Sequence, residues 1–327
     1  MKARRNFLLS AAAAPLLWSH GNVFANAEPT RVLVGFPPGG STDAVARAFA
    51  KSIRPAFPQE FVVENRTGAS GRIAARGMKG ARDSRSILFT PDFVLVVYPH
   101  LFSNNGYDIF TDFAPIGTVV RSDYILVAGP AVPKEINNPK DYLKWVASNP
   151  SQNNAFGSSG PGSTLHFAGE MLAKASGVPL RYVPYKGGAP ALIDLAGGHI
   201  PATVNTVGES IELIRSGKVR AIGCFGEKRS RFLPEVPTMV ESGYKNVVVD
   251  LVFFALMPAG APVEDVQKLS KELLTFGSKP SDQAVLNSLC MEVATSTPAQ
   301  LKTKLEADYQ YWKKEIASTG FKMEDEK

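Results

Sequence analysis

A strand, a glycine-rich turn and the start of a helix follow one another directly in residues 32–43. Residues 32–36 are apolar and predict a buried strand. Residues 37–40 (Pro-Pro-Gly-Gly) end that strand, and Ser41 is expected to cap a helix over 44–53. Such a turn leaves backbone N–H groups pointing out of a helix N-terminus, which carries about half a positive charge and accepts carboxylate or phosphate.

The same pattern returns along the chain, each time with small or hydroxyl residues in the turn. The expected strands and the turns that follow them are 61–63 with 65–71, 86–89 with 90–92, 154–157 with 158–164, 180–184 with 185–188, and 200–204 with 205–206. Strands that alternate with helices predict an α/β fold with mostly parallel sheets. Ligands of such sheets bind outside the carboxyl ends of the strands, where these turns gather.

The composition of the turns favours an anion as the ligand. They carry Gly, Ser, Thr, Asn and Lys, and the two acidic exceptions, Asp43 and Asp92, are expected to cap or orient the chain. Lys186 adds a full positive charge, although a solvated lysine beside a turn is the simpler alternative. His166 lies in the first turn of a helix over 165–175, and a structural histidine there is the more common case. The alternative for the first turn is that its glycines serve only the change of direction.

Several function classes lose support from the sequence. The first turn has neither the Gly-Lys-Ser/Thr of a P-loop nor the Gly-x-Gly-x-x-Gly spacing of a dinucleotide site. We find no Gly-x-Ser-x-Gly elbow, no cysteine paired with a histidine and no two-histidine metal motif, so no cofactor or metal is predicted and an enzyme is less favoured. The formal net charge of +6 is scattered, which argues against nucleic-acid binding.

Residues 1–27 are typical of an export signal. Lys2, Arg4 and Arg5 precede an apolar stretch over 7–18, and Ala-Asn-Ala at 25–27 fits a cleavage site. The paired arginines resemble a twin-arginine signal, and an ordinary secretory signal is the alternative. Both routes predict a periplasmic protein. In that compartment the two cysteines, Cys224 and Cys290, would be able to pair, but their apolar surroundings favour buried free thiols.

We expect two lobes, with the chain passing from one to the other and back. Apolar runs at 114–120 and 124–127 precede a break near residue 130, and the strong strand expected at 251–257 begins the return. The predicted division is 28–122 together with 240–327 for lobe 1, and 123–239 for lobe 2.

A family resemblance rests on runs spread in order over the mature chain. The first run reads Val-Gly-Phe-Pro-Pro-Gly-Gly-Ser-Thr-Asp at 34–43, and the others are 62–71, 157–163, 184–192, 214–221, 228–230, 236–238 and 255–260. In these runs the chain resembles the substrate-binding proteins of tripartite tricarboxylate transporters, also called the Bordetella uptake gene family. The resemblance implies a two-lobed periplasmic binding protein fold of type II that closes over a small carboxylate between its lobes.

The residues that match the binding turns of the family come from both lobes. They are Phe36, Pro38, Gly39, Gly40, Ser41, Thr42, Asp43, Gly68, Ala69, Ser70, Gly71, Thr90, Asp92, Ser158, Ser159, Gly162, Ser163, Thr164, His166, Tyr185, Lys186, Gly187 and Asn205. Two positions depart from the family. Asn205 stands where many members carry an Asp, which argues against a cationic amino-acid ligand, and Phe93 with Pro91 replaces a small polar turn, which suggests an altered pocket floor.

The sequence therefore predicts a monomeric periplasmic receptor that hands an organic carboxylate to the membrane permease subunits of a tripartite transporter. Two alternatives stay open from the sequence. One is a sensor whose closed form docks on a receptor kinase, and the other is a secreted α/β enzyme that acts on a carboxylate.

Overall fold

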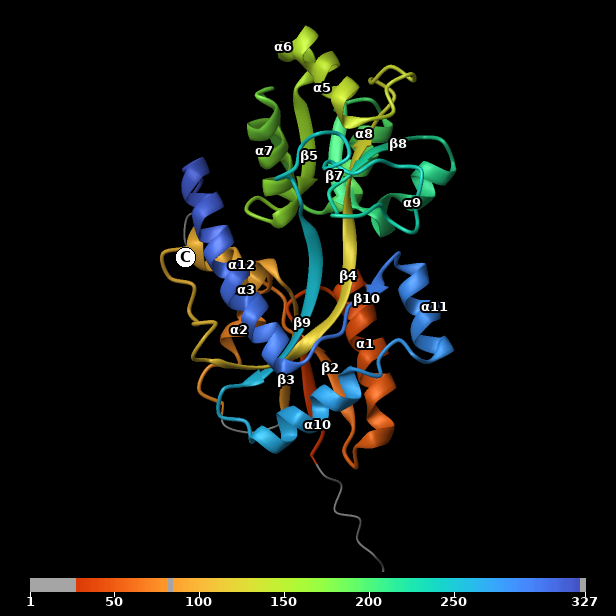
Figure 1. Cartoon of the computed structure of the whole chain (residues 1–327). Coiled ribbons are helices and arrows are strands. Elements are labelled where there is room, and N and C mark those ends of the chain that lie inside the picture. Colours follow the sequence, from red (N-terminus) through yellow and green to blue (C-terminus); the bar gives the residue numbers. More distant parts are fainter. Residues whose placement is uncertain (1–27, 82–84, 324–327) are drawn as a thin grey trace, which may run out of the picture.

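The computed structural model describes residues 28–81 and 85–323, so the predicted export signal at 1–27 lies outside the described residues. The described chain forms two α/β lobes that are joined end to end by two long crossing segments, β4 and the approach to β9 (Figure 1). This confirms the predicted fold class. Within the described part of the chain, no helix has both the length and the apolar character that crossing a bilayer requires.

The sheet of the first lobe has the order β2-β1-β3-β9-β4-β10. Strands β2, β1 and β3 are parallel, with β2 at the edge of the sheet, whereas β9 runs antiparallel to both β3 and β4. The bounds are β1 (Thr30–Val34), β2 (Phe61–Asn65), β3 (Ser86–Pro91), β4 (Phe113–Ala128), β9 (Asp250–Pro258) and β10 (Glu292–Val293).

The sheet of the second lobe has the order β6-β5-β7-β4-β8. Here β5 is parallel to β6 and β7, and β4 runs antiparallel between β7 and β8. The bounds are β5 (Ala155–Ser159), β6 (Arg181–Tyr185), β7 (Ala202–Thr206) and β8 (Arg220–Cys224).

Helices cover both sheets, and each of the parallel strands β1, β2, β3, β5, β6 and β7 is followed by a helix, as the sequence predicts (Figure 1). The α-helices are α1 (Ser41–Ile53), α2 (Arg72–Arg76), α3 (Phe93–Val96), α4 (Tyr98–Leu101), α5 (Pro139–Ser148), α6 (Pro150–Asn153), α7 (Thr164–Ser176), α8 (Gly188–Ala196), α9 (Val207–Arg215), α10 (Val263–Leu273), α11 (Pro280–Ser288) and α12 (Pro298–Thr319). Two short 3-10 helices are η1 (Arg54–Ala56) and η2 (Ala69–Gly71).

Strand β4 belongs to both sheets. The sequence predicts two separate apolar runs here, and the structure joins them into one strand of 16 residues. Up to Asp123 this strand pairs with β9, and from Tyr124 onward it pairs with β7 and β8. The polar residues between the two runs hide this continuity in the sequence, because Ser122 and Asp123 interrupt the apolar pattern although both are buried.

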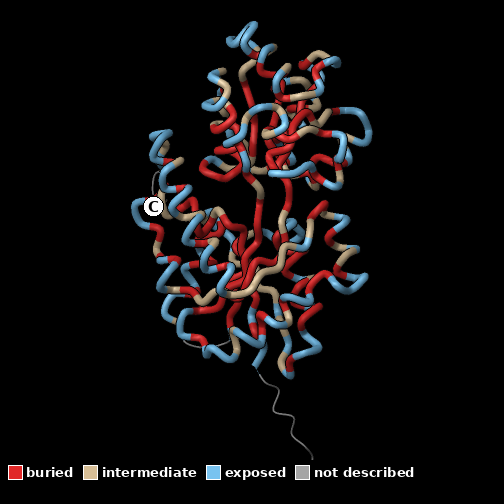
Figure 2. The backbone as a smooth tube through the Cα atoms, viewed as in Figure 1, coloured by how far each residue is buried: buried red, intermediate tan, exposed pale blue. Residues whose placement is uncertain are grey.

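The core forms two apolar clusters, and β4 contributes to both of them. Alternate residues of a strand point to opposite faces, so Tyr124 and Leu126 pack in the larger cluster whereas Ile125 and Val127 pack in the smaller one under α8 and α9. Figure 2 shows buried backbone in both lobes and along much of the crossing segments, with short intermediate stretches between. Both cysteines are free and buried in the smaller cluster, in keeping with the expected free thiols.

Two local predictions are wrong. The N-cap of α1 is Gly40 and not Ser41, because Gly40 has the extended backbone of a cap and its carbonyl accepts the first helical hydrogen bond, from Ala44 N–H at 2.9 Å. The Ala- and Arg-rich residues 73–81 predict a longer helix with Ser70 as its cap. The structure forms only α2, of five residues, and Ser70 lies inside η2 with a left-handed backbone, φ +53°.

We propose that the lobes divide where hydrogen bonds change partner, near the predicted boundary of 122/123. For the return passage, Val249 N–H donates to Phe225 O at 2.9 Å and Tyr244 N–H donates to Met239 O at 2.9 Å. These bonds favour a boundary close to residue 249 in place of the predicted 239/240.

The N-terminus of α12 offers a test of the fold. Thr297 and Gln300 form a reciprocal capping box there. Thr297→Ala should therefore lower the free energy of unfolding by about 1 kcal/mol, measured by urea denaturation. Thr303→Ala, at an exposed position of the same helix, should leave the free energy unchanged or slightly higher. Equal effects of the two variants would contradict the capping role.

Candidate functional site

The carboxyl ends of the parallel strands of both lobes face the crossing, which is the point where β4 passes from one sheet to the other. In the first lobe, β3 ends at Pro91, which pairs with Phe253 of β9. Phe253 lies three residues after Asp250, the first residue of β9, and Asp250 pairs with Asp123 of β4. In the second lobe, β7 ends at Thr206 opposite Tyr124. The adjacent pairs at Asp123 and Tyr124 thus join the two sheets, and the turns after the parallel strands gather on either side of this point.

The turn after β1 is shaped by the carboxylate of Asp43. This buried carboxylate accepts hydrogen bonds from Gly39 N–H at 3.0 Å, from Asn65 Nδ2 at 2.9 Å and from Arg47 Nε at 3.0 Å. Burial alone would raise the pKa of the Asp43 carboxyl, but these hydrogen bonds outweigh it and leave the pKa below the ordinary value. Asp43 therefore orients the turn, because its carboxylate is bound by groups of the protein itself.

Other groups of the first turn remain open to solvent. Pro38, Gly39, Gly40 and Ser41 are exposed, whereas Thr42 is buried. The first backbone N–H groups of a helix have no partner within the helix, so the amides at the start of α1 are donors available to an anion. Gly39 needs its glycine, because its φ of +82° is left-handed.

The turn after β2 has four successive residues with positive φ. These are Gly68, Ala69, Ser70 and Gly71. A left-handed backbone is strained for Ala and Ser, and such strain persists only where the surroundings hold it. Gly71 packs closely against the ring of Phe36, since an ideal Cβ on Gly71 would lie 3.1 Å from two atoms of that ring. The two first-lobe turns are thus held together.

The turn after β3 is buried in the protein. Thr90 and Asp92 are 1% and 5% exposed, and Asp92 caps α3 by accepting from Phe93 N–H at 2.7 Å. Burial raises the pKa of the Asp92 carboxyl well above its ordinary value, and the nearby Asp250 adds to the shift. The ring of Phe93 meets Phe36 edge to face with centroids 6.2 Å apart. The ring of Phe93 therefore packs against Phe36, at the start of the first turn.

The loop after β5 is closed by its own hydrogen bonds. Ser163 caps α7: its Oγ accepts from His166 N–H at 3.3 Å and donates to Ser159 O at 2.8 Å. His166 is buried, accepts from Gly162 N–H at Nδ1 (3.2 Å) and stacks on Tyr182 with ring centroids 3.9 Å apart. These contacts describe a structural histidine, and its predicted contact with ligand stays a prediction.

Tyr124 connects the crossing to this loop. Its hydroxyl lies 2.7 Å from Thr164 Oγ1, and both side chains are buried. Burial raises the pKa of the Tyr124 hydroxyl well above its ordinary value, and the charge of Asp92 from the first lobe acts in the same direction. The structure thereby brings Asp92, Tyr124 and Thr164 into one neighbourhood. Ser158, at the end of β5, is fully buried and its Oγ has no hydrogen-bond partner among the described residues.

The turn after β6 presents the positive charge that the sequence predicts. Lys186 is exposed, and no ion pair of its ammonium is found within residues 28–81 and 85–323. The hydroxyl of Tyr185 donates to Asp194 at 2.7 Å. Burial, and after it this hydrogen bond, raises the pKa of Tyr185 to about 12. Gly187 is the N-cap of α8 with φ +133° and no side-chain cap.

Two residues near these turns escape the sequence analysis. Tyr124 looks like one more apolar residue of a strand. Glu209 lies in the first turn of α9, where Thr206-x-x-Glu209 is a sequence signal for a capping box, and its carboxylate accepts from Asn205 Nδ2 at 3.2 Å. Within the described residues, no group of three His, Cys, Asp or Glu side chains is arranged to hold a metal ion.

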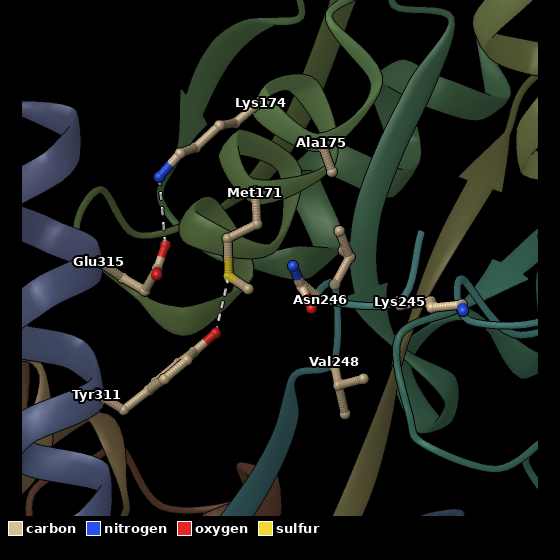
Figure 3. A pocket seen from close by; sticks show the side chains of 9 residues that line it. Met171, Lys174, Ala175, Lys245, Asn246, Val248, Tyr311 and Glu315 are labelled. Carbon is tan, nitrogen blue, oxygen red and sulfur yellow. Dashed lines mark hydrogen bonds and ion pairs between the residues drawn. The ribbon is translucent and has the colours of Figure 1, made fainter. Parts of the chain in front are cut away.

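A separate pocket of about 570 Å³ lies on the α12 side of the crossing (Figure 3). Its walls come from α7, residues 245–248 and α12. Contacts between α7 and α12 border it: Lys174 Nζ lies 3.7 Å from Glu315 Oε2, and Tyr311 donates its hydroxyl to Met171 Sδ at 3.8 Å. None of the predicted ligand contacts lines this pocket.

Comparisons with known proteins agree with this architecture. The sequence profile described as tripartite tricarboxylate transporter family receptor matches residues 45–320. Protein BugT of Bordetella pertussis is 30% identical over 302 residues, which cover 91% of each chain. The structure of the periplasmic binding protein BugD is 34% identical, with a TM-score of 0.77 over 91% of this chain and 99% of BugD. An R. palustris protein solved with adipate is 28% identical, with a TM-score of 0.79 over 90% of this chain and 97% of that protein.

The network of Asp43 predicts a pH dependence. A carboxyl whose folded-state pKa lies below its ordinary value stabilises the fold above that value, and this contribution is lost as the pH falls through the folded pKa. Asp43→Asn should lower the free energy of unfolding at pH 7 by roughly 1–3 kcal/mol and flatten the loss of stability between about pH 5 and pH 3. The measurement is urea denaturation over that pH range.

Glu306→Gln serves as the control, since Glu306 is exposed on α12. It should leave the pH profile of stability unchanged. If the Asp43→Asn profile ran parallel to the wild-type profile, Asp43 would not hold the first turn through its charge.

Proposed function

The chain belongs to the tripartite tricarboxylate transporter receptor family, and we propose that it captures a small organic carboxylate between its lobes and delivers it to the membrane subunits of such a transporter. In this proposal the protein acts in the periplasm as a binding protein without turnover of its ligand. The predicted turns of both lobes form the binding site.

One observation carries this proposal most directly. The exposed start of α1 in the first lobe and the exposed Lys186 turn in the second lobe follow parallel strands whose carboxyl ends face the same crossing. Each turn offers what a carboxylate needs, which is backbone N–H groups at a helix N-terminus or an ammonium group. Two such sets on opposite lobes suit an anion that is enclosed when the lobes approach each other.

The choice of a carboxylate has support from a relative. The R. palustris protein solved with adipate shares 28% of its residues and nearly the whole fold with this chain. A ligand with carboxylate groups agrees with the turns described above, which are rich in backbone donors.

Two substitutions test the proposed site. Gly40→Val should weaken binding at least tenfold by covering the start of α1, while the fold tolerates it because Gly40 has φ −73° and ψ 166°. Lys186→Ala should weaken binding about tenfold by removing the charge. The measurement is isothermal titration of the purified mature protein with the best ligand from a thermal-shift screen of mono-, di- and tricarboxylates, aromatic acids and amino acids.

The matched control is Lys218→Ala. Lys218 is exposed and precedes β8 at its end far from the crossing, where Arg220 pairs with Ala128. Its loss should leave affinity unchanged. Unaltered affinity in both site variants would count against the proposed site, and a ligand consumed during incubation would instead indicate an enzyme.

The export route has its own test. We propose that the chain is exported and cleaved after Ala27, so that the mature protein begins at Glu28. Mass spectrometry of the periplasmic fraction should find that N-terminus. Replacing Arg4 and Arg5 by Lys should abolish export if the route is twin-arginine and leave it intact if the route is the general secretory one. A full-length protein retained in the cytoplasm of the wild type would contradict the proposal.

A further inference from the structure

A negative charge lies directly beside the positively charged turn of the second lobe. An ideal Cβ built on Gly188, the first residue of α8, would lie 2.3 Å from Glu209 Oε2 and 2.7 Å from Asn205 Nδ2. Only a glycine allows this close approach. The Glu209 carboxylate therefore packs against the start of α8, two residues along the chain from Lys186.

Glu209 is open to solvent although protein surrounds it. The residue is exposed, yet burial by the surrounding protein is the largest cause that raises the pKa of its carboxyl. The Glu209 carboxylate thus contacts Gly188 and Asn205 on its protein side, while the residue is exposed to solvent. A ligand that enters from solvent between the lobes can therefore meet this carboxylate.

The neighbour of Glu209 adds a second, independent observation. Asn205 is fully buried, and while its Nδ2 donates to Glu209, its Oδ1 has no hydrogen-bond partner among the described residues. The two side chains thus present acceptor oxygens in one place. Since a buried acceptor without a donor is costly, this corner of the site suits a group with N–H or O–H donors better than a second carboxylate.

A structural role for Glu209 is the main alternative. Its backbone N–H donates to Thr206 Oγ1 at 3.3 Å, and Thr206 also helps to keep the carboxyl charged. A glutamine serves equally well in a capping box. The charge of Glu209 can therefore be removed while the cap is kept, which separates the two roles by experiment.

We propose that Glu209, with Asn205, makes this receptor selective for carboxylates that also carry a hydroxyl or ammonium donor. The ligand carboxylate binds at the amides of α1 and at Lys186, and its donor group points to Glu209. An unsubstituted dicarboxylate would instead bring a like charge to Glu209, which is unfavourable at short range. The inference rests on the proposed function and names the ligand class of the same site. It also opposes the sequence-based argument that Asn205 speaks against a cationic amino-acid ligand.

Matched ligand sets test this selectivity. We would titrate the mature wild-type protein with succinate, malate and aspartate, with glutarate, 2-hydroxyglutarate and glutamate, and with phenylpropionate, phenyllactate and phenylalanine. Members of each set share a chain length and differ in the donor. In the set that binds, a donor-bearing member should bind at least tenfold more tightly than the plain acid. Equal or tighter binding of the plain acid would overturn the inference without any variant.

Glu209→Gln then tests the residue. It should reduce the ratio of affinities between donor-bearing and plain acid at least fivefold, with the larger loss for an ammonium ligand, and leave the plain acid bound as tightly or more tightly. Glu212→Gln, an exposed position of α9 paired with Arg215 at 2.9 Å, should leave the ratio unchanged. A ratio unaltered in Glu209→Gln would overturn the role of Glu209. Absence of binding by a folded wild-type protein to every carboxylate would overturn the proposed function and this inference with it.

Discussion

The site depends on the change of partner along β4. A single strand pairs with β9 up to Asp123 and with β7 from Tyr124, so one continuous backbone fixes the register of both lobes. Because strands β3 and β7 end at this crossing, their following turns must face each other across it. The positions of the turns that follow β3 and β7 are set by this geometry.

The predicted binding turns contain two kinds of residue, those bonded to the protein and those with donors open to solvent. Asp43 and Ser163 direct their polar atoms to the protein and hold the turns in place, whereas the exposed start of α1 at Ser41 and the exposed Lys186 leave donors at the surface. The strained, left-handed residues around Ser70 are held in the same way, by close packing of Gly71 against a ring. Rigid turns lower the entropic cost of ligand binding, which agrees with a receptor that must bind a small ligand through few contacts.

Local patterns in the sequence predicted most of the fold, and the family resemblance supplied its overall form. The strand-turn-helix repeats, the cap at Ser163 and the capping box at Thr297 depend on neighbours within four residues, so they can be read from the chain. The continuity of β4 and the placement of Glu209 beside Gly188 depend on residues far apart in sequence. No local pattern carries such contacts, and for that reason the acid at this corner was missed. The predicted binding role of the turn residues stays a prediction.

The central claim is that a carboxylate binds between the turns of the two lobes, and a crystal structure of the mature protein grown with its tightest-binding carboxylate tests it most directly. The account predicts the ligand carboxylate within hydrogen-bond distance of the backbone amides at Gly40 to Thr42 and of the turn at Lys186, with the lobes closed over it. A ligand found in the pocket between α7 and α12, or on the outer surface of either lobe, would contradict the account.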